Sequence, residues 1–277
     1  MRVLVLGGSG LLGSALLRRT VDRGDRAFGA YLRERAPIGG VDWHRVDLRD
    51  RAGTAASIRA IAPDLIINAA FRQSEWATTA DGAANAASAT AEIGARLLFV
   101  SSDAVFSGQG SPYVESATPD PITPYGAAKA AAETAVRALT PTAVIVRTSL
   151  IIGRGGASGH ERRAHAAVRG EGHLFTDDIR CPVDVVDLAA AMLELAATGA
   201  SGVHHLAGPE PISRYDLGRL IARRDGLDPD GIRPGKRSEL AMPGPLDVRL
   251  DSAATQRLVR TKLRGPSVFL ATRGDRP

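Results

Sequence analysis

The sequence predicts an α/β protein built on a doubly wound parallel sheet, with a smaller C-terminal lobe. Three observations predict it. Short apolar runs alternate with segments of helical spacing over the first 150 residues, a glycine-rich turn follows the first apolar run, and the alternation loosens beyond residue 150. Strands that alternate with helices are joined by right-handed crossovers, so they form a parallel sheet with helices on both faces.

The first half of the chain supplies most of the regular elements. Its apolar runs predict strands at residues 3–6, 26–31, 43–46, 64–68, 96–100 and 143–147, and we expect about seven such strands in total. Apolar spacing of three and four residues predicts helices at 11–21, from the third strand to about 61, at 79–93 and at 124–139. The second half is expected to contain helices at 184–198 and 215–223, with irregular segments at 153–159 and 226–245.

The composition excludes several classes of protein. Of the 277 residues, 44% are apolar and 23% are charged, which is an ordinary globular mixture. The 35 basic and 30 acidic residues give a net charge of +5, and only three of the basic residues are lysines: Lys129, Lys236 and Lys262. Because the arginines are scattered among acidic residues, we expect a solvated surface and no nucleic-acid partner.

The sequence carries no targeting or metal signal. No apolar run approaches the ~20 residues that cross a bilayer, and the start of the chain lacks the regions of a signal peptide, so we expect no membrane partner. Cys181 is the single cysteine, so no disulfide framework is expected and a cytoplasmic location is the default. His160 and His165 stand one residue too far apart for a zinc helix motif, and we expect no metal site.

A phosphate-binding turn is predicted between the first strand and the first helix. Gly7, Gly10 and Gly13 form a G-x-x-G-x-x-G motif there, and Leu11 and Leu12 begin the helix. Small residues let the backbone turn tightly and approach a pyrophosphate, which the free N–H groups of the helix start attract. A simple tight turn is the alternative interpretation.

The end of the second strand indicates which dinucleotide would bind. Arg33 stands 20 residues after Gly13, where an NAD site usually carries an acidic residue. A cation there suits the 2′-phosphate of NADPH, the adjacent Glu34 keeps NADH as an alternative, and an exposed arginine without a ligand is the other interpretation. We interpret residues 1–150 as a dinucleotide-binding core and residues 151–277 as a mainly substrate-binding lobe, interleaved with the core. The lobe and the carboxyl edge of the sheet would enclose a cleft.

Polar and small residues close the third and fourth strands. Asp47 and Leu48 close the third, and Asn68, Ala69 and Ala70 close the fourth. Both groups fall at strand carboxyl ends, where open α/β sheets contact their ligands. We therefore predict that these residues bind the cofactor, with nicotinamide or ribose lying against the backbone beyond Asn68.

A proton-transfer site is predicted at the end of the fifth strand. This strand ends in Ser101, Ser102 and Asp103, and Tyr125 and Lys129 follow on a helix. Residues i and i+4 of a helix share a face, so the phenol and the ammonium would lie side by side. The ammonium is expected to lower the pKa of the phenol from its ordinary ~10, while a serine hydroxyl holds the reacting oxygen. The set suits hydride chemistry at a carbonyl or an alcohol, although a surface pair on an amphipathic helix is the alternative.

The chain resembles an extended short-chain dehydrogenase/reductase, a family with a Rossmann-type fold, and most closely the dTDP-4-dehydrorhamnose reductase group. The resemblance covers nearly the whole chain, more loosely after residue 150. It is carried by the glycine turn, Asn68-Ala69-Ala70, residues 101–108, Tyr113 with Glu115, Pro124-Tyr125-Gly126 with Lys129 and Glu133, Arg147-Thr148-Ser149, and residues 187–189 and 202–206.

The resemblance implies NAD(P)H-dependent reduction of a 4-keto sugar nucleotide. By position, Ser102 would orient the C4 carbonyl, and Tyr125 would donate the proton. Lys129 would tune Tyr125 and hold the nicotinamide ribose. The implied substrate contacts are Ser102, Asp103, Phe106, Tyr125 and Leu150, and the implied cofactor contacts include Ser101, Tyr125 and Lys129.

Two departures from the group bear on the sugar. The group usually carries Trp where this chain has Leu150, so an aromatic platform for the sugar is missing, and the run Phe71-Arg72-Gln73 is unusual. A sugar-nucleotide epimerase on the same scaffold and a non-catalytic NADP-binding regulatory subunit stay open as alternatives. A dehydratase is disfavoured, because Ala104 stands where the dehydratases that resemble this family carry an acid.

Two arginines are further candidates for contact with a sugar diphosphate. Arg147 ends the sixth predicted strand, and Arg180 precedes Cys181. Guanidinium groups suit a phosphate or a carboxylate equally, so a structural ion pair is an equal alternative for each of the two arginines.

We also expect the protein to form a homodimer.

Overall fold

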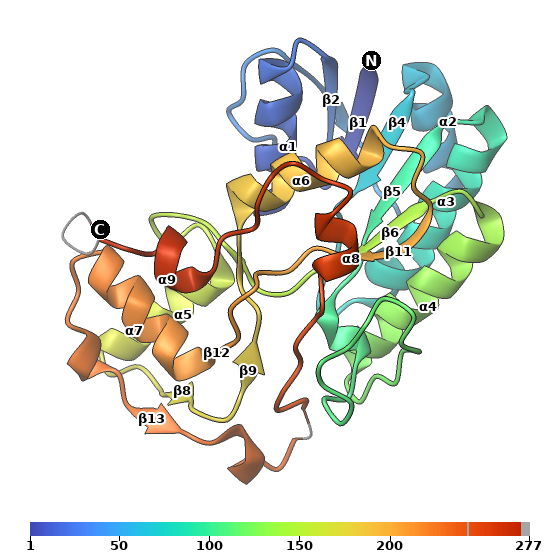
Figure 1. Ribbon diagram of the computed structural model, residues 1–277. Helices are drawn as coiled ribbons and strands as arrows, with labels where there is room; N and C mark the ends of the chain where they lie inside the picture. Colours follow the sequence, from blue (N-terminus) through green and yellow to red (C-terminus); the bar gives the residue numbers. More distant parts are fainter. Residues whose placement is uncertain (243, 273–277) are drawn as a thin grey trace.

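The computed structural model describes residues 1–242 and 244–272, and within these its centre is one sheet of seven parallel strands (Figure 1). Residue 243 of the predicted irregular segment and residues 273–277 of the predicted lobe lie outside this description. The order across the sheet is β11-β6-β5-β4-β1-β2-β3, and the predicted α/β class with a parallel sheet is confirmed. The strands are β1 (Arg2–Leu6), β2 (Arg26–Tyr31), β3 (Val41–Arg45), β4 (Leu65–Asn68), β5 (Arg96–Val100), β6 (Val144–Arg147) and β11 (Gly202–His205).

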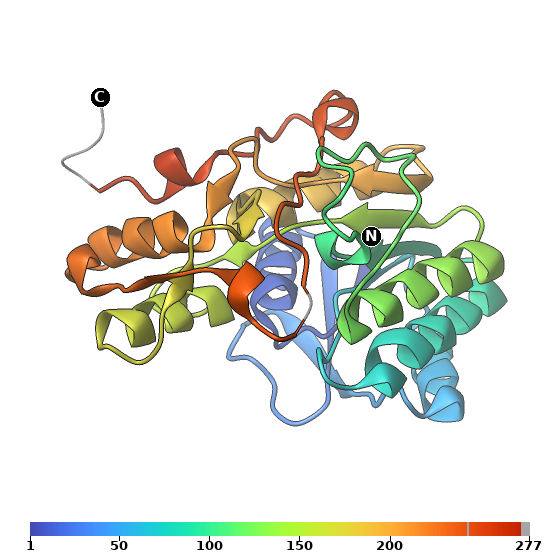
Figure 2. The same cartoon turned by 90° about the horizontal axis from the view of Figure 1, so that it is seen from below.

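Helices cover both faces of this sheet (Figure 1, Figure 2). On one face, α1 (Leu11–Asp22) packs beside α6 (Val185–Ala196). On the other face lie α2 (Arg51–Ile61), α3 (Gly82–Ile93) and α4 (Pro124–Leu139). Two elements from beyond residue 150, α6 and β11, therefore belong to the core.

Alternate residues of the central strands point to opposite faces of the sheet. In β1, Val3 and Val5 pack with α1 and α6, whereas Leu4 and Leu6 pack with α2 and α3. All four side chains are fully buried. Because both faces of the sheet are covered, its inner strands are continuously apolar, which is why they are recognisable in the sequence.

The rest of the chain forms a lobe beside the carboxyl edge of the sheet. Its two longer helices, α5 (Gly159–Val168) and α7 (Arg214–Arg224), pack against each other (Figure 2). Short ladders tie distant segments of the lobe together. They pair β7 (Ile151–Ile152) with β10 (Val183–Asp184), β9 (Ile179–Arg180) with β12 (Ile212–Ser213), and β8 (Leu174–Phe175) with β13 (Pro234–Gly235), and the short helices α8 (Ala253–Gln256) and α9 (Pro266–Phe269) follow.

The structure corrects several predicted boundaries. The third strand begins at Val41, two residues earlier than predicted. The helix predicted at 79–93 begins as a π-helical turn, η1 (Ala77–Asp81), and continues as α3. The segment predicted to be irregular at 226–245 contains two short 3₁₀ turns and β13.

Replacing Leu188 of α6 by alanine should lower the free energy of unfolding by about 2–5 kcal/mol, because this side chain is fully buried against the core of the sheet. The matched control is Val186→Ala on the same helix. Its side chain is 58% exposed, so a change below about 0.5 kcal/mol is expected. Urea denaturation followed by circular dichroism measures both. Equal stability of the two variants would contradict the packing of α6 into the core.

Candidate active site

A cavity of about 800 Å³ lies between the carboxyl edge of the sheet and the lobe. The start of α1, the segments that follow β4, β5 and β6, and the start of α4 line one side, and residues of α5, β8, β9 and α7 line the other. The predicted site residues that meet in this cavity are Gly10, Leu11, Leu12, Gly13, Ala69, Ser101, Ser102, Asp103, Tyr125, Lys129 and Leu150.

The other predicted site residues do not line this cavity; they are Gly7, Arg33, Asp47, Leu48, Asn68, Ala70 and Phe106. Arg33 is exposed just beyond β2. The carboxylate of Asp47 is held by Arg49, whose Nη2 donates to Oδ2 at 2.7 Å, and this hydrogen bond lowers the pKa of Asp47. Asn68 is buried, and its Oδ1 accepts the backbone N–H of Ala70 at 3.1 Å, which shapes the turn after β4.

Phe106 does not line the cavity, so it is not placed to make the expected substrate contact. The turn η2 (Asp103–Val105) follows β5, and Phe106 lies beyond it in a small core cluster. Its ring is fully buried, stacks on Tyr113 with 3.9 Å between ring centroids, and faces the guanidinium of Arg147 at 5.0 Å. Phe106 therefore supports the wall of the site from behind.

The glycine turn is packed too tightly for larger residues. Gly7 has a φ of +77°, and a Cβ there would lie 2.8 Å from the backbone of Ala70. A Cβ at Gly13 would collide with the carbonyl oxygen of Gly7, so the close approach of strand and helix requires glycine. Gly10 is exposed and precedes α1 without a side-chain cap. The first N–H groups of α1 are therefore left for an anion such as a phosphate.

Local contacts seat Tyr125 beside Ser102. The hydroxyl of Thr123 caps α4 by accepting the N–H of Gly126 at 3.1 Å. A Cβ at Gly126 would collide with the carbonyl oxygen of Ala104, so the start of α4 lies directly on the turn that follows Ser102. The phenol of Tyr125 thereby lines the same cavity as Ser102.

Burial disfavours the charged forms of both Tyr125 and Lys129. Desolvation raises the pKa of Tyr125, a hydrogen bond with Ser102 acts in the opposite direction, and the charge of Asp103 raises the pKa further. The expectation that the ammonium lowers this pKa is wrong, because desolvation of the phenolate is the larger effect. Desolvation also lowers the pKa of Lys129 to about 7, although the charge of Glu133 acts to raise it.

The ammonium of Lys129 is held by a carbonyl oxygen and by aromatic rings. Its Nζ donates to the carbonyl oxygen of Val100 at 2.8 Å. The same atom lies 4.9 Å from the ring centroid of Phe99 and 5.4 Å from that of Phe71. Aromatic faces attract a cation, so these contacts hold the amino group of Lys129 at the wall of the cavity and favour its protonated form there.

A buried ion pair supports the ends of β5 and β6. Glu133 and Arg147 are both fully buried, and Arg147 donates to Glu133 from Nη2 at 2.8 Å and from Nε at 3.0 Å. The hydroxyl of Ser101 also donates to Glu133, at 2.6 Å. Of the two interpretations of Arg147, the structure therefore supports the structural ion pair.

Asp103 joins the sheet side of the cavity to the lobe. Its carboxylate accepts hydrogen bonds from Ser102 at 3.2 Å and from Ser149 at 2.7 Å. On the lobe side, the same carboxylate lies 3.7 Å from Nε of Arg180. Asp103 is buried and engaged on three sides, so its position in the cavity is well defined.

The ion-pair chain continues from Arg180 across the lobe. Asp178 lies 2.8 Å from Arg180 and 3.3 Å from Arg214. Arg214 in turn donates to Nδ1 of His160 at 3.0 Å. Burial, and then the charge of Arg214, lower the pKa of His160 to about 3, so its imidazole is neutral and accepts this bond. We call Arg180, Asp178, Arg214 and His160 the charged wall.

Sequence reasoning missed most of this wall and also missed Phe71 as a cavity residue. His160 and Arg214 are 54 residues apart and meet only because α5 packs on α7. Phe71 lines the cavity, and the unusual run that begins at this residue is the one local signal in the sequence that could have indicated it.

Two other sequence features have separate partners. His165 lies 2.7 Å from Asp225, whereas His160 contacts Arg214, so the two histidines do not converge. Among the residues that the structure describes, no group of His, Cys, Asp and Glu could hold a metal ion. Cys181 is buried, and burial raises the pKa of its thiol to about 11, as suits a small buried thiol.

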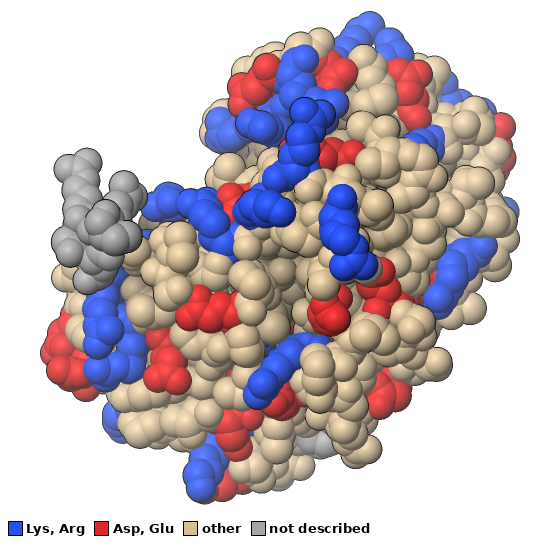
Figure 3. Space-filling view, in the orientation of Figure 1, with Lys and Arg blue, Asp and Glu red and all other residues tan. Residues whose placement is uncertain are grey.

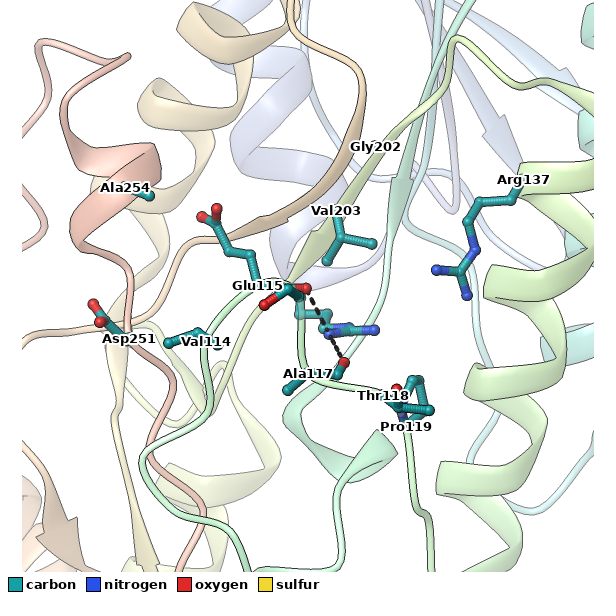
Figure 4. A pocket seen from close by; sticks show the side chains of 12 residues that line it. Val114, Glu115, Ala117, Thr118, Pro119, Arg137, Gly202, Val203, Asp251 and Ala254 are labelled. Atoms are coloured by element: carbon teal, nitrogen blue, oxygen red, sulfur yellow. Dashed lines mark hydrogen bonds between the residues drawn. The ribbon is translucent and has the colours of Figure 1, made fainter.

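A second hollow, of about 730 Å³, lies beside the edge strand β11 (Figure 4). Figure 4 shows Glu115 and Ala117 at its centre, between Asp251 and Arg137. The carbonyl oxygens of Glu115 and Ala117 accept hydrogen bonds from Arg147 at 3.4 and 3.1 Å. This hollow therefore borders the back of the Glu133–Arg147 pair.

The surface agrees with the expectation of a solvated exterior. Basic and acidic side chains are interspersed over the face shown in Figure 3. Lys236 and Lys262 are exposed, whereas Lys129 is buried. In the part of the chain that the structure describes, no helix has the length and apolar character needed to cross a membrane.

Known proteins resemble the chain over most of its length. Residues 1–265 match the family model described as RmlD substrate binding domain. A dTDP-4-keto-6-deoxy-D-glucose reductase of Streptomyces niveus is 32% identical over 254 residues, which cover 87% of this chain and 84% of the relative. A dTDP-4-dehydrorhamnose reductase of Mycobacterium tuberculosis is 31% identical, over 88% of this chain and 82% of the relative.

A solved structure agrees with the architecture. The crystal structure of dTDP-4-dehydrorhamnose reductase from Bacillus anthracis, in complex with NADP, superposes with a TM-score of 0.82 at 22% identity. The match covers 97% of this chain and 96% of that one. At this identity the likeness establishes the fold.

Glu133→Gln should lower the free energy of unfolding by about 3–5 kcal/mol, because it leaves the charge of Arg147 buried without its partner. The matched control is Glu92→Gln, which breaks the exposed pair with Arg59 and should cost less than about 1 kcal/mol. Urea denaturation measures both. A loss as small for Glu133→Gln as for Glu92→Gln would show that the buried pair is not a structural support.

Proposed function

The chain belongs to the family of the RmlD substrate binding domain, and we propose that it is an NAD(P)H-dependent oxidoreductase that reduces a 4-keto sugar nucleotide. The observation that carries the proposal is the meeting of Ser102, Tyr125 and Lys129 with the glycine turn in one cavity. The relatives named as reductases of dTDP-4-keto-6-deoxy-D-glucose and of dTDP-4-dehydrorhamnose support the same substrate class.

The glycine turn fits the pyrophosphate of a dinucleotide. The cradle at Gly10 and the open N–H groups at the start of α1 would hold it. Arg33 would hold the 2′-phosphate of NADPH, which agrees with the NADP in the Bacillus anthracis structure, and Glu34 keeps NADH as the alternative. The nicotinamide of the bound cofactor would supply the hydride. The cofactor contacts at the strand ends stay predictions for Asp47, Leu48, Asn68, Ala69 and Ala70.

Tyr125 is the proton donor in this proposal. The phenol holds its proton at neutral pH because even its ordinary pKa of ~10 lies well above 7. Burial raises this pKa further, so proton transfer depends on stabilisation of the phenolate that forms. Ser102, which lines the same cavity as Tyr125, would hold the C4 carbonyl oxygen within reach of that proton. When the proton passes to the new hydroxyl group, the resulting phenolate is compensated by the nearby ammonium of Lys129, a compact charge that a planar guanidinium would replace poorly.

The charged wall fits the diphosphate of a sugar nucleotide. Asp178 pairs with both Arg180 and Arg214 and so fixes the two guanidinium groups beside the cavity. Arg180 also donates to the carbonyl oxygens of Ile179, Leu246 and Pro245, so Arg214 has more N–H groups left for phosphate oxygens. Asp103 stands between this wall and Ser102, where it would contact the sugar. The substrate would then extend from the lobe to the catalytic hydroxyl groups.

We propose residues 1–150 as the dinucleotide-binding core, completed by α6 and β11, and the rest of 151–277 as the substrate-binding lobe. A homodimer and a cytoplasmic location stay predictions.

The fate of the cofactor separates a reductase from an epimerase on the same scaffold, because a reductase consumes one NADPH for each hydroxyl group formed and an epimerase regenerates its cofactor.

The direct test mixes the purified protein with NADPH and a panel of dTDP-4-keto-6-deoxy sugars and follows NADPH oxidation by absorbance. We expect oxidation that matches product formation one to one with at least one sugar. Tight binding of NADPH without oxidation in the presence of any of these sugars would favour the regulatory subunit over the enzyme.

Tyr125→Phe should lower kcat by about 100-fold or more, because general acid catalysis contributes about 10²–10⁴ to a rate. The affinity for NADPH, measured by fluorescence titration, should stay unchanged. Tyr215→Phe is the matched control, since this phenol accepts a hydrogen bond from Arg219 on α7 and does not line the cavity. Turnover by Tyr125→Phe at the wild-type rate would remove Tyr125 from the mechanism.

A further inference from the structure

Phe71 exposes a large aromatic ring inside the active-site cavity. Its side chain is 53% exposed, although it stands three residues after the buried strand β4. It lines the same cavity as Ser102, Tyr125 and Leu150. An apolar side chain exposed in a concave site is typical of a ligand contact, because a ligand can cover the surface that water otherwise meets.

The backbone beside Phe71 is fixed. The next residue, Arg72, donates its N–H to the hydroxyl of Thr79 at 3.0 Å, and that hydroxyl donates back to the carbonyl oxygen of Arg72 at 2.8 Å. Thr79 is buried in η1. The backbone that carries the ring is therefore already fixed by hydrogen bonds. Packing of the ring against a ligand then costs little additional conformational entropy.

The ring lies beside the catalytic groups. Its centroid is 5.8 Å from that of Tyr125, with a tilt of 49° between the ring planes. Nζ of Lys129 lies 5.4 Å from the same centroid. Phe71 is therefore within reach of a sugar whose carbonyl oxygen is held by Ser102 and Tyr125.

The other rings of the cavity wall are less available. Phe175 is half-buried, lies against His173 with 5.2 Å between ring centroids, and has the guanidinium of Arg237 over its ring at 5.9 Å. Leu150, on the side of β6, is buried and carries no ring. Phe71 is thus the aromatic surface beside Tyr125 that a bound sugar can cover.

We propose that Phe71 is a specificity-determining residue whose ring packs against the apolar face of the 4-keto sugar. This inference rests on the proposed function, because it takes the sugar to be held at Ser102 and Tyr125. A 6-deoxy sugar offers C–H bonds and a methyl group, which suit an aromatic face better than water. The diphosphate would be held by the charged wall and the sugar by Phe71.

The test separates the sugar from the nucleotide. Binding of dTDP-L-rhamnose and of dTDP is measured by calorimetry for the wild type and for Phe71→Leu, which removes the ring but keeps apolar volume. We expect about three- to tenfold weaker binding of dTDP-L-rhamnose and unchanged binding of dTDP. Phe71→Tyr keeps the ring and should bind both ligands as the wild type does.

A matched control and the kinetics complete the experiment. Trp76→Leu removes an exposed ring from the same segment outside the cavity, and should change neither affinity. In turnover, Phe71→Leu should raise KM for the keto sugar by a similar factor and leave KM for NADPH unchanged. Equal affinities of Phe71→Leu and wild type for dTDP-L-rhamnose, or equal weakening for both ligands, would overturn the inference.

The two proposals fail in different ways. If the wild type oxidises NADPH with a keto sugar while Phe71→Leu matches it in KM and binding, only the role of Phe71 is overturned. If the wild type neither turns over a keto sugar nor binds either dTDP ligand, the proposed function is overturned and this inference with it.

Discussion

The parallel register of the central sheet is the constraint on which the site depends. β1, β4, β5 and β6 follow one another across the sheet in parallel order, so their carboxyl ends reach one edge. The glycine turn, Phe71, Ser102 and Leu150 follow these four strands and meet there although they are distant in sequence. The crossover helix α4 begins at the same edge and adds Tyr125 and Lys129. The contacts that bury the sheet thus also assemble the cavity.

Removal of water from this edge sets its acid–base chemistry. Desolvation raises the pKa of Tyr125 and lowers that of Lys129, so both shifts favour the neutral form of the group. A phenol that holds its proton can act as a proton donor, and the protonated form of Lys129 would stabilise the phenolate that remains. Beneath the site, the Glu133–Arg147 pair holds the ends of β5 and β6 together. The opposite charges of the two side chains balance each other.

Local signals in the sequence predict the elements well. The helix predicted at 124–139 occupies those residues, because Thr123 caps it and its apolar spacing is regular. The charged wall could not be predicted, since its members come together only where β9 pairs with β12 and α5 packs on α7. The position of Phe106 and the direction of the pKa shift of Tyr125 depend on burial, which residue spacing does not reveal. The sequence shows the strand ends of the predicted cofactor site, but it does not show which of them line the cavity.

The most direct measurement is the titration of Lys129 itself. The sequence contains three lysines, so labelling lysine with ¹³C at Cε gives a spectrum that Lys129→Met can assign. We predict that the signal lost in this variant titrates in the wild type near pH 7, because burial disfavours the ammonium. Titration of that signal at the ordinary lysine pKa of about 10.4 would show that the ammonium is solvated, and would contradict a desolvated proton-transfer site.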